Sequence, residues 1–294
     1  MSTAAVAAPS SSRLRAYVEL TKPRIIELLL VTTVPAMFLA ADGWPGGWLI
    51  IATLIGGTLS AAGANSINNV VDRDIDQIMQ RTSKRPFPTE RVTVKPALAL
   101  GITLGVAGLV WLWLTVNLLA GLLSTAGLLF YVFVYTLYLK RSSTQNIVIG
   151  GAAGAVPALV GWAAVTDSLS LPAWILFAIV FFWTPPHFWA LSLKYKDDYA
   201  AAGVPMLPVV AGEAFTLLHI FLYSVLLVAV TFLLFPAAGM GLIYLITAAV
   251  LGIAFVAGAA RLRTRPHLAM KFFGYSNLYL VGLSVGIIVD RLVA

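Results

Sequence analysis

Three oxygen-bearing side chains recur every four residues near the end of an apolar stretch: Asn68, Asp72 and Asp76. In a helix of about 3.6 residues per turn, this spacing places the three on one face, whereas Asp74 points roughly the opposite way. Amide and carboxylate oxygens suit a hard cation such as Mg²⁺, which usually binds through one or two carboxylates together with substrate phosphates. The stripe therefore predicts a magnesium site, and its alternative is an acidic, solvated helix end.

Basic side chains follow this stripe directly, at Arg81, Lys84 and Arg85. Guanidinium and ammonium groups form charge-assisted hydrogen bonds with phosphate oxygens. Carboxylates that are followed at once by bases predict a diphosphate that a metal ion bridges to the protein.

A second polar stretch, residues 183–199, ends another apolar run. His187 lies about two turns inside that run, and Lys194, Lys196, Asp197 and Asp198 lie at its end. Ionisable groups at membrane depth are costly and usually mark function. A functional role for His187 and a purely structural, hydrogen-bonded histidine both remain open. If the two polar stretches face the same compartment, they can share one cavity.

The composition explains which elements must position these residues. Of the 294 residues, 60% are hydrophobic and only 11% are charged, whereas soluble domains carry about 25% charged residues. The composition is typical of a polytopic helical membrane protein. The chain has no cysteine, which excludes disulfides and thiolate metal sites, and its histidines are too far apart in sequence to predict a zinc site.

A bilayer core requires about 20 apolar residues per helix. On this measure the chain is all-α, a membrane helical bundle of nine transmembrane helices at about residues 25–42, 48–69, 96–116, 119–139, 147–166, 172–193, 215–235, 239–260 and 270–290. The fifth expected span carries Gly150, Gly151, Gly154, Ala155 and Gly161. Such small residues favour either close helix packing or a slot for a flat ligand.

The basic residues predict the orientation. With nine spans, every Lys and Arg except Arg291 falls on one side of the membrane, and that side is cytoplasmic under the positive-inside rule. The N-terminus is then cytoplasmic and the C-terminus outside. The net charge of +7 follows the membrane and does not indicate nucleic acid. We expect a disordered cytoplasmic tail over residues 1–19 and a single transmembrane domain over residues 20–294.

These motifs resemble a known group of enzymes. The pattern Asn68-x₃-Asp72-x₃-Asp76 resembles the first aspartate-rich motif of the intramembrane aromatic prenyltransferase superfamily, which contains the ubiquinone-pathway enzymes. Other segments are similar to one branch, the protohaem IX farnesyltransferases (haem O synthases): residues 20–24, 79–86, 140–142, 146–151, 186–189, 197–199 and 202–208. The similarity covers nearly the whole membrane region. At the end of the sixth expected span, His187 and Lys194 stand where many superfamily members carry carboxylates.

The resemblance implies an Mg²⁺-dependent prenyltransferase that moves a farnesyl group from farnesyl diphosphate to a vinyl group of protohaem IX (haem B). Water addition would complete the reaction and give haem O and diphosphate. By this resemblance, Asn68, Asp72 and Asp76 hold the metal, and Asp72, Asp76 and His187 are catalytic. The implied substrate-binding residues are Arg81, Lys84, Arg85, Lys140, Arg141, Lys194, Lys196, Asp197 and Asp198.

Two other functions stay open at this point. One is prenyl transfer to another aromatic acceptor, such as a quinone precursor or chlorophyllide, and the other is transport of haem or lipid without chemistry. The expected partners are the two substrates, the lipid bilayer, and a haem A synthase or terminal oxidase that accepts the product. The expected location is a bacterial plasma membrane, with the active site facing the cytoplasm.

Overall fold

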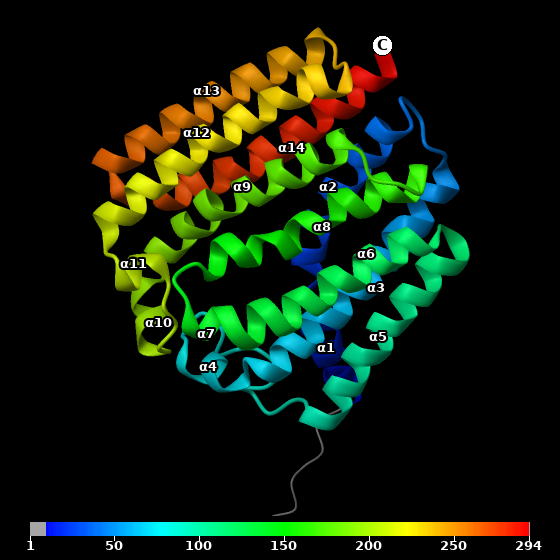
Figure 1. Cartoon of the computed structure of the whole chain (residues 1–294). Helices are drawn as coiled ribbons and strands as arrows, with labels where there is room; N and C mark the ends of the chain where they lie inside the picture. The colour runs from blue at the N-terminus through cyan, green and yellow to red at the C-terminus, as the bar shows by residue number, and fades with distance from the viewer. Residues whose placement is uncertain (1–9, 294) are drawn as a thin grey trace, which may run out of the picture.

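The computed structural model of the chain describes residues 10–293, without the side chains of residues 10–12 and 24–30. Within this described part the chain is helical and contains no strand (Figure 1). The prediction of an all-α fold is confirmed. The helices, in chain order, are α1 (Ser10–Leu20), α2 (Pro23–Ala40), α3 (Gly47–Val71), α4 (Arg73–Ile78), α5 (Val94–Thr115), α6 (Leu118–Leu129), the π-helix η1 (Phe130–Leu139), α7 (Lys140–Ser142), α8 (Asn146–Thr166), α9 (Leu171–Lys194), α10 (Lys196–Ala201), α11 (Leu207–Val210), α12 (Glu213–Ala238), α13 (Leu242–Thr264), the 3₁₀-helix η2 (Pro266–Leu268) and α14 (Ala269–Val293).

Eight helical segments of the described chain are long and apolar enough to cross a bilayer. They are α3, α5, the continuous segment Leu118–Ser142, α8, α9, α12, α13 and the segment Pro266–Val293. The first expected span corresponds to α2, of which Val31–Ala40 is the apolar part with described side chains. Nine spans, and the sidedness of the two termini, therefore stay predictions.

The surface of this bundle suits lipid. Large apolar side chains such as Leu114, Phe133 and Ile253 are exposed, and a soluble monomer rarely shows extensive apolar surface. A bilayer removes the cost of that exposure, because its acyl chains are as apolar as the side chains.

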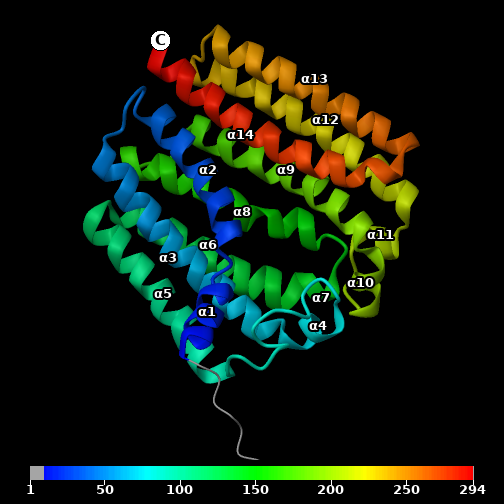
Figure 2. The same cartoon turned by 180° about the vertical axis from the view of Figure 1, so that it is seen from behind.

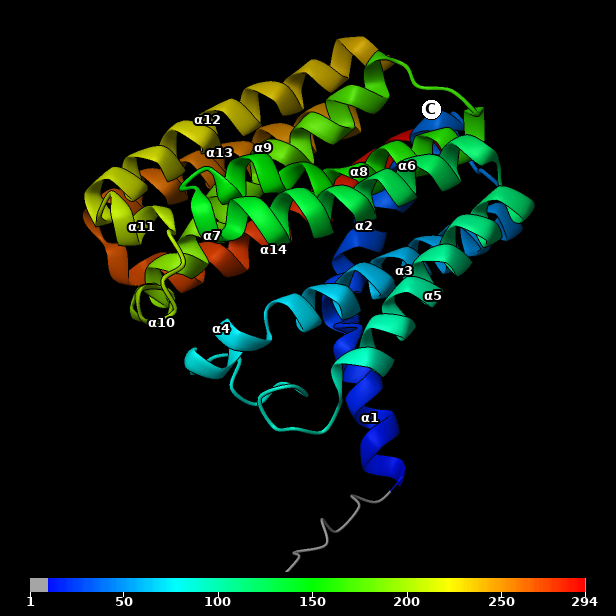
Figure 3. The same ribbon diagram turned by 60° about the horizontal axis from the view of Figure 1, so that its bottom comes forward.

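Each long helix packs against the next one along the chain, and α14 returns to pack against α2. The helix α2 also contacts α8, so α2 packs against α3, α8 and α14 (Figure 2). The short helices α1, α4, α7, α10 and α11 gather at one end, and the C-terminal end of α14 lies at the other (Figures 1 and 2). Figure 3 brings the end with the short helices forward. The polar ends of α3 and α9 thus lie on the same side of the bundle.

Local chemistry sets several of these boundaries. Asn117 separates α5 from α6, where its side chain accepts a hydrogen bond from Ala120 N at 2.8 Å and caps the new helix. Gly63 and Gly101 let α3 and α5 approach closely, because a Cβ at Gly63 would lie 2.6 Å from the Gly101 carbonyl oxygen. Small residues at such crossings allow membrane helices to pack without a hydrophobic driving force.

The structure differs from the disordered tail expected over residues 1–19. Residues 10–20 form α1, whose Ala16 and Leu20 are fully buried against the end of the bundle. Residues 1–9 lie outside the described residues.

Candidate active site

The stripe of Asn68, Asp72 and Asp76 spans a break between two helices. Helix α3 ends at Val71, and Asp72 has φ −82° and ψ 0° before α4 begins. The backbone hydrogen bonds from Asp72 N to Asn68 O and from Asp76 N to Asp72 O, both 2.9 Å, continue through the break. All three side chains are buried, with 2%, 0% and 2% exposure. The acidic helix end is therefore not a solvated cap.

Two lysines from other parts of the chain reach Asn68 and Asp72. Lys140 Nζ lies 2.5 Å from Asp72 Oδ2, and Lys22 Nζ donates to Asn68 Oδ1 at 2.5 Å. The Asn68 amide nitrogen donates to Asp72 Oδ2 at 2.8 Å and to Thr136 Oγ1 at 3.1 Å. Asn68 thus links an ammonium group on one side to a carboxylate on the other.

The remaining aspartates pair with arginines. Arg85 Nη1 donates to both carboxylate oxygens of Asp76 at 2.9 Å. Asp74 is exposed, as the spacing predicts, and accepts two 2.7 Å hydrogen bonds from Arg141. These hydrogen bonds lower the pKa of Asp74 to about 2. Arg141 consequently faces α4 and lies 3.9 Å from Asp72 Oδ1.

Lys22 belongs to the site although no motif in the sequence marks it as a site residue. Two amides of α3 hold the connection before α2 in place: Asn65 Nδ2 donates to Thr21 O at 3.0 Å and Asn69 Nδ2 to Leu20 O at 2.9 Å. Lys22 takes a left-handed backbone with φ 53°, which aims its ammonium inward. Burial lowers the pKa of Lys22 to about 7, and the Arg85 guanidinium adds to this effect. The one feature of the sequence that could have identified Lys22 as a site residue is its place in segment 20–24, which resembles the family.

The loop after α4 joins the two polar stretches. The backbone N–H of Arg81 donates to Asp198 Oδ2 at 3.0 Å, and Arg81 Nη2 donates to the Tyr199 hydroxyl at 3.4 Å. The guanidinium also lies over the rings of Tyr195 and Tyr199, at 5.6 and 5.9 Å from their centroids. Burial raises the pKa of Tyr199, so this hydroxyl stays protonated. The end of α3–α4 is therefore fastened to α10, as a shared site requires.

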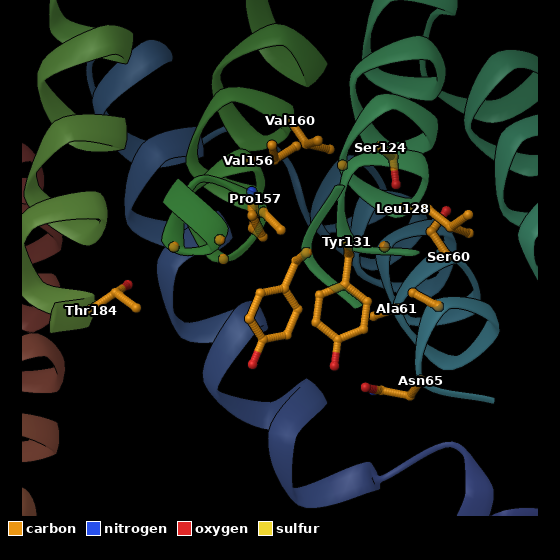
Figure 4. Close-up of a pocket in the computed structure, with 18 of the residues that line it drawn as sticks. Ser60, Ala61, Asn65, Ser124, Leu128, Tyr131, Val156, Pro157, Val160 and Thr184 are labelled. Carbon is orange, nitrogen blue, oxygen red and sulfur yellow. The ribbon is translucent and has the colours of Figure 1, made fainter. Parts of the chain in front are cut away.

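The bundle contains an apolar cavity of about 300 Å³, and Figure 4 shows side chains that line it. Side chains and backbone of α2, α3, α6, η1, α8 and α9 line it. On α3 its lining includes Ala61, Ala64 and Asn65, one turn before Asn68. Tyr131 and Tyr135 of η1 stack at 5.4 Å between ring centroids and also line the cavity. The cavity therefore leads along α3 to the cluster of acids and bases.

The three glycines at the start of α8 do different things. A Cβ at Gly150 would collide with the Tyr135 ring, and one at Gly151 would lie 3.1 Å from Thr184 of α9. A Cβ at Gly154 would meet nothing within 4 Å, and Gly154 lines the cavity. All three glycines line the cavity, so both interpretations of the small residues apply: Gly150 and Gly151 also allow close packing, and Gly154 leaves open space for a ligand.

His187 lies apart from this cavity lining. Its ring stacks between Trp183 at 4.1 Å and Phe273 at 4.4 Å, and Nδ1 lies 2.7 Å from Ser276 Oγ. It thus packs between α9 and α14. Lys84, Lys194 and Asp197 are exposed and Lys196 is half-buried, and in the described part of the chain these four side chains make no hydrogen bond or ion pair.

The residues of the cluster fit a magnesium ion that arrives with a phosphate. The buried Asp72 Oδ1 has no hydrogen-bond partner among the described residues, and such an orphaned carboxylate oxygen is available to a cation. No group of three or more acidic or histidine side chains that could hold a metal occurs in the described part of the chain. Two carboxylates and an amide leave most coordination positions to water and phosphate, which is how Mg²⁺ usually binds.

Comparison with known proteins decides the family. The UbiA prenyltransferase family model matches residues 29–281. The chain belongs to this family. A protoheme IX farnesyltransferase of Clavibacter sepedonicus is 53% identical over 95% of this chain and 92% of its own length. Proteins of the same name from Nostoc and Mycobacteroides abscessus are 51% and 49% identical, covering 95% and 98% of this chain and 89% and 93% of their own lengths.

Solved structures of the UbiA family share the fold. A structure reported for digeranylgeranylglyceryl phosphate synthase matches with a TM-score of 0.79 and 21% identity, over 96% of this chain and 99% of that one. A UbiA homologue from Archaeoglobus fulgidus, bound to DMAPP and Mg²⁺, matches with a TM-score of 0.67 and 15% identity, over 93% and 99% of the two chains. These matches confirm a UbiA-type membrane fold for this chain.

Proposed function

We propose that this UbiA-family enzyme transfers a farnesyl group from farnesyl diphosphate to a vinyl group of protohaem IX, with water addition, and releases diphosphate. The names of relatives at about half identity support the substrates. The observation that carries the proposal is the junction of a buried acid–base cluster with an apolar cavity. Such a junction suits a substrate with a highly charged head and a hydrocarbon tail.

The chain's own residues would act first on the diphosphate. Lys22, Lys140 and Arg85 already lie within the cluster, and they would transfer their hydrogen bonds from Asn68, Asp72 and Asp76 to phosphate oxygens. These preorganised cations stabilise the charge that develops as the allylic C–O bond breaks. Magnesium held by Asn68, Asp72 and Asp76 would supply Lewis-acid polarisation of the phosphate.

The cavity would hold the farnesyl chain and exclude water from it. Its apolar walls along α3, α6 and α8 suit hydrocarbon, and an allylic cation must meet the vinyl carbon before it meets bulk water. The haem would approach from the end that carries α10, where the exposed Lys194 and the half-buried Lys196 are free to meet its propionates. We place this end at the cytoplasmic face of a bacterial plasma membrane, and a haem A synthase or terminal oxidase would accept the product.

The test uses purified protein with farnesyl diphosphate, protohaem and Mg²⁺, and mass spectrometry of the extracted haem. Wild type is expected to give a farnesylated haem and free diphosphate, and both are lost on chelation of the metal. Asp72→Asn removes a buried charge that pairs with Lys140, and we expect at least about a 100-fold loss, the effect of removing one transition-state stabilising group.

The matched control is Asp42→Asn, which removes the same charge from an ion pair with Arg291 at the other end of the bundle. Its turnover should stay near that of wild type. Assays with a quinone precursor or chlorophyllide in place of haem test the other acceptors. Prenylation of one of these without prenylation of haem would refute the proposal, and so would haem binding without diphosphate release.

A further inference from the structure

The proposed reaction makes two opposite demands on water. Bulk water must not reach the allylic cation, yet one water must react after the new carbon–carbon bond has formed. An apolar cavity meets the first demand. The second requires a water held at a fixed place by two to four polar partners.

Polar groups without partners gather at one end of the cavity. The hydroxyls of Tyr131 and Tyr135 have no hydrogen-bond partner in the part of the chain that the structure describes. Figure 4 shows the Tyr131 hydroxyl directed toward the end of the cavity at which Asn65 lies. The Asn65 Nδ2 group donates to Thr21 O at 3.0 Å, which turns its carbonyl oxygen Oδ1 away from that contact. This oxygen also has no partner among the described residues.

The stack fixes where the tyrosine hydroxyls lie. The two rings pack with an interplanar angle of 28°, and Gly150 leaves room for the Tyr135 ring against α8. The π-helical turn is closed by a hydrogen bond from Thr136 Oγ1 to Tyr131 O at 2.8 Å. Both tyrosines therefore line the cavity from one short stretch of η1, at the end toward Asn68.

We propose that Tyr131 and Asn65, with Tyr135 beside them, hold the water that adds to the farnesylated haem. This inference rests on the proposed function. The two O–H bonds of the water would point to Tyr131 Oη and Asn65 Oδ1, which leaves an oxygen lone pair directed into the cavity.

The step balances with the proposed reactants. The allylic C–O bond breaks, the farnesyl carbon bonds to the terminal vinyl carbon, and the positive charge moves to the vinyl carbon next to the porphyrin. The held water forms a C–O bond to that carbon, and its proton passes to the released diphosphate. Without the water, the same cation loses a proton from the neighbouring carbon and gives an alkene that is lighter by one water molecule.

The experiment compares Tyr131→Phe with wild type, using farnesyl diphosphate, protohaem and Mg²⁺ and mass spectrometry of the extracted haem. Phenylalanine keeps the ring stack and removes only the hydroxyl. We expect the ratio of hydroxylated to alkene product to fall about tenfold or more, the scale of one lost orienting hydrogen bond. Tyr138→Phe is the matched control, because Tyr138 lies on the same helix but is 67% exposed outside the cavity. Its product ratio should match wild type.

The outcomes separate this inference from the proposed function. If wild type makes no farnesylated haem, the proposed function fails. If Tyr131→Phe makes only the hydroxylated product, whether its turnover is fast or slow, the water assignment is wrong. A folded, monodisperse Tyr131→Phe protein that makes no farnesylated haem also overturns the water assignment. Water adds only after the carbon–carbon bond has formed, so a variant that cannot hold the water should still release the alkene.

Discussion

Replacing Gly154 by leucine should shorten the prenyl chain that the enzyme accepts. A Cβ at Gly154 meets nothing within 4 Å, and the residue lines the cavity of about 300 Å³. The new side chain would therefore grow into the ligand space without displacing a neighbouring helix. Leucine is also a better helix former than glycine, by up to about 1 kcal/mol, so the α8 backbone should tolerate the change.

The size of the loss in kcat/KM follows from the part of the prenyl chain that no longer fits in the cavity. A leucine side chain would displace about four carbon atoms of the bound chain, and each buried methylene contributes about 0.8 kcal/mol. The loss for farnesyl diphosphate is then about 3 kcal/mol, on the order of 100-fold in kcat/KM. Geranyl diphosphate, shorter by one isoprene unit, should lose much less, and the preference between the two donors should move toward geranyl.

The assay measures kcat/KM for both donors with protohaem as acceptor. Gly274→Leu is the matched control, because Gly274 lies within α14, a Cβ there also meets nothing within 4 Å, and it is not part of the cavity lining. Its preference should equal that of wild type. An equal loss for both donors in Gly154→Leu would refute the placement of the chain along α8, and so would an unchanged preference.

Three further predictions concern the parts that support this cavity. Gly150→Ala would press a methyl group into the Tyr135 ring, and at an overpacking cost of about 1–3 kcal/mol it should lower turnover equally for all donor lengths. Asp198→Ala removes the acceptor of the Arg81 N–H, so hydrogen exchange in the loop of residues 79–91 should accelerate roughly 5–30-fold, with unchanged exchange in α13 as control. The hydrogen bond from Arg91 lowers the pKa of Glu19 below its usual value, so the stability that this bond gives to α1 is present at neutral pH and is lost on acidification through the lowered pKa. Proteolysis within α1 should therefore increase at acid pH. Constant cleavage from neutral to acid pH would contradict this prediction.

The sequence was enough to predict the helices and the buried stripe, because both depend on local spacing. Long apolar runs specify membrane helices, and a four-residue repeat on one helix keeps its face whatever the rest of the chain does. Asp74 accordingly faces outward and pairs with Arg141. The sequence did not predict Lys22 as a site residue, because its position depends on a left-handed backbone and on hydrogen bonds from side-chain amides of α3. No one-dimensional pattern contains that contact.

The positions of His187, Tyr131 and Tyr135 could not be predicted for the same reason, because they depend on how the helices pack. A histidine inside an apolar span looks functional, but which face of α9 it occupies depends on how α9 and α14 pack, and here it lies against Ser276. Tyr131 and Tyr135 are unremarkable in an aromatic-rich span, and their separation of four residues alone does not say whether they face lipid or a cavity. Their π-helical turn and the adjacent Gly150 decide this, and both are tertiary features.

The charges of the buried cluster explain why metal and diphosphate should bind together. Arg85 and Lys140 pair with the two buried carboxylates, Asp76 and Asp72, and Lys22 donates to Asn68 beside them, so with Lys22 protonated the cluster carries one more cationic group than acids. A lone Mg²⁺ would add positive charge to this excess at a buried place, where unpaired charge is costly. A diphosphate with one Mg²⁺ carries net negative charge, which would offset the excess and would give Lys140 and Arg85 phosphate oxygens in place of the carboxylates that would hold the metal. The arrangement therefore favours the metal–diphosphate pair over either ion alone, and it protects the carboxylates from unpaired burial until that pair arrives.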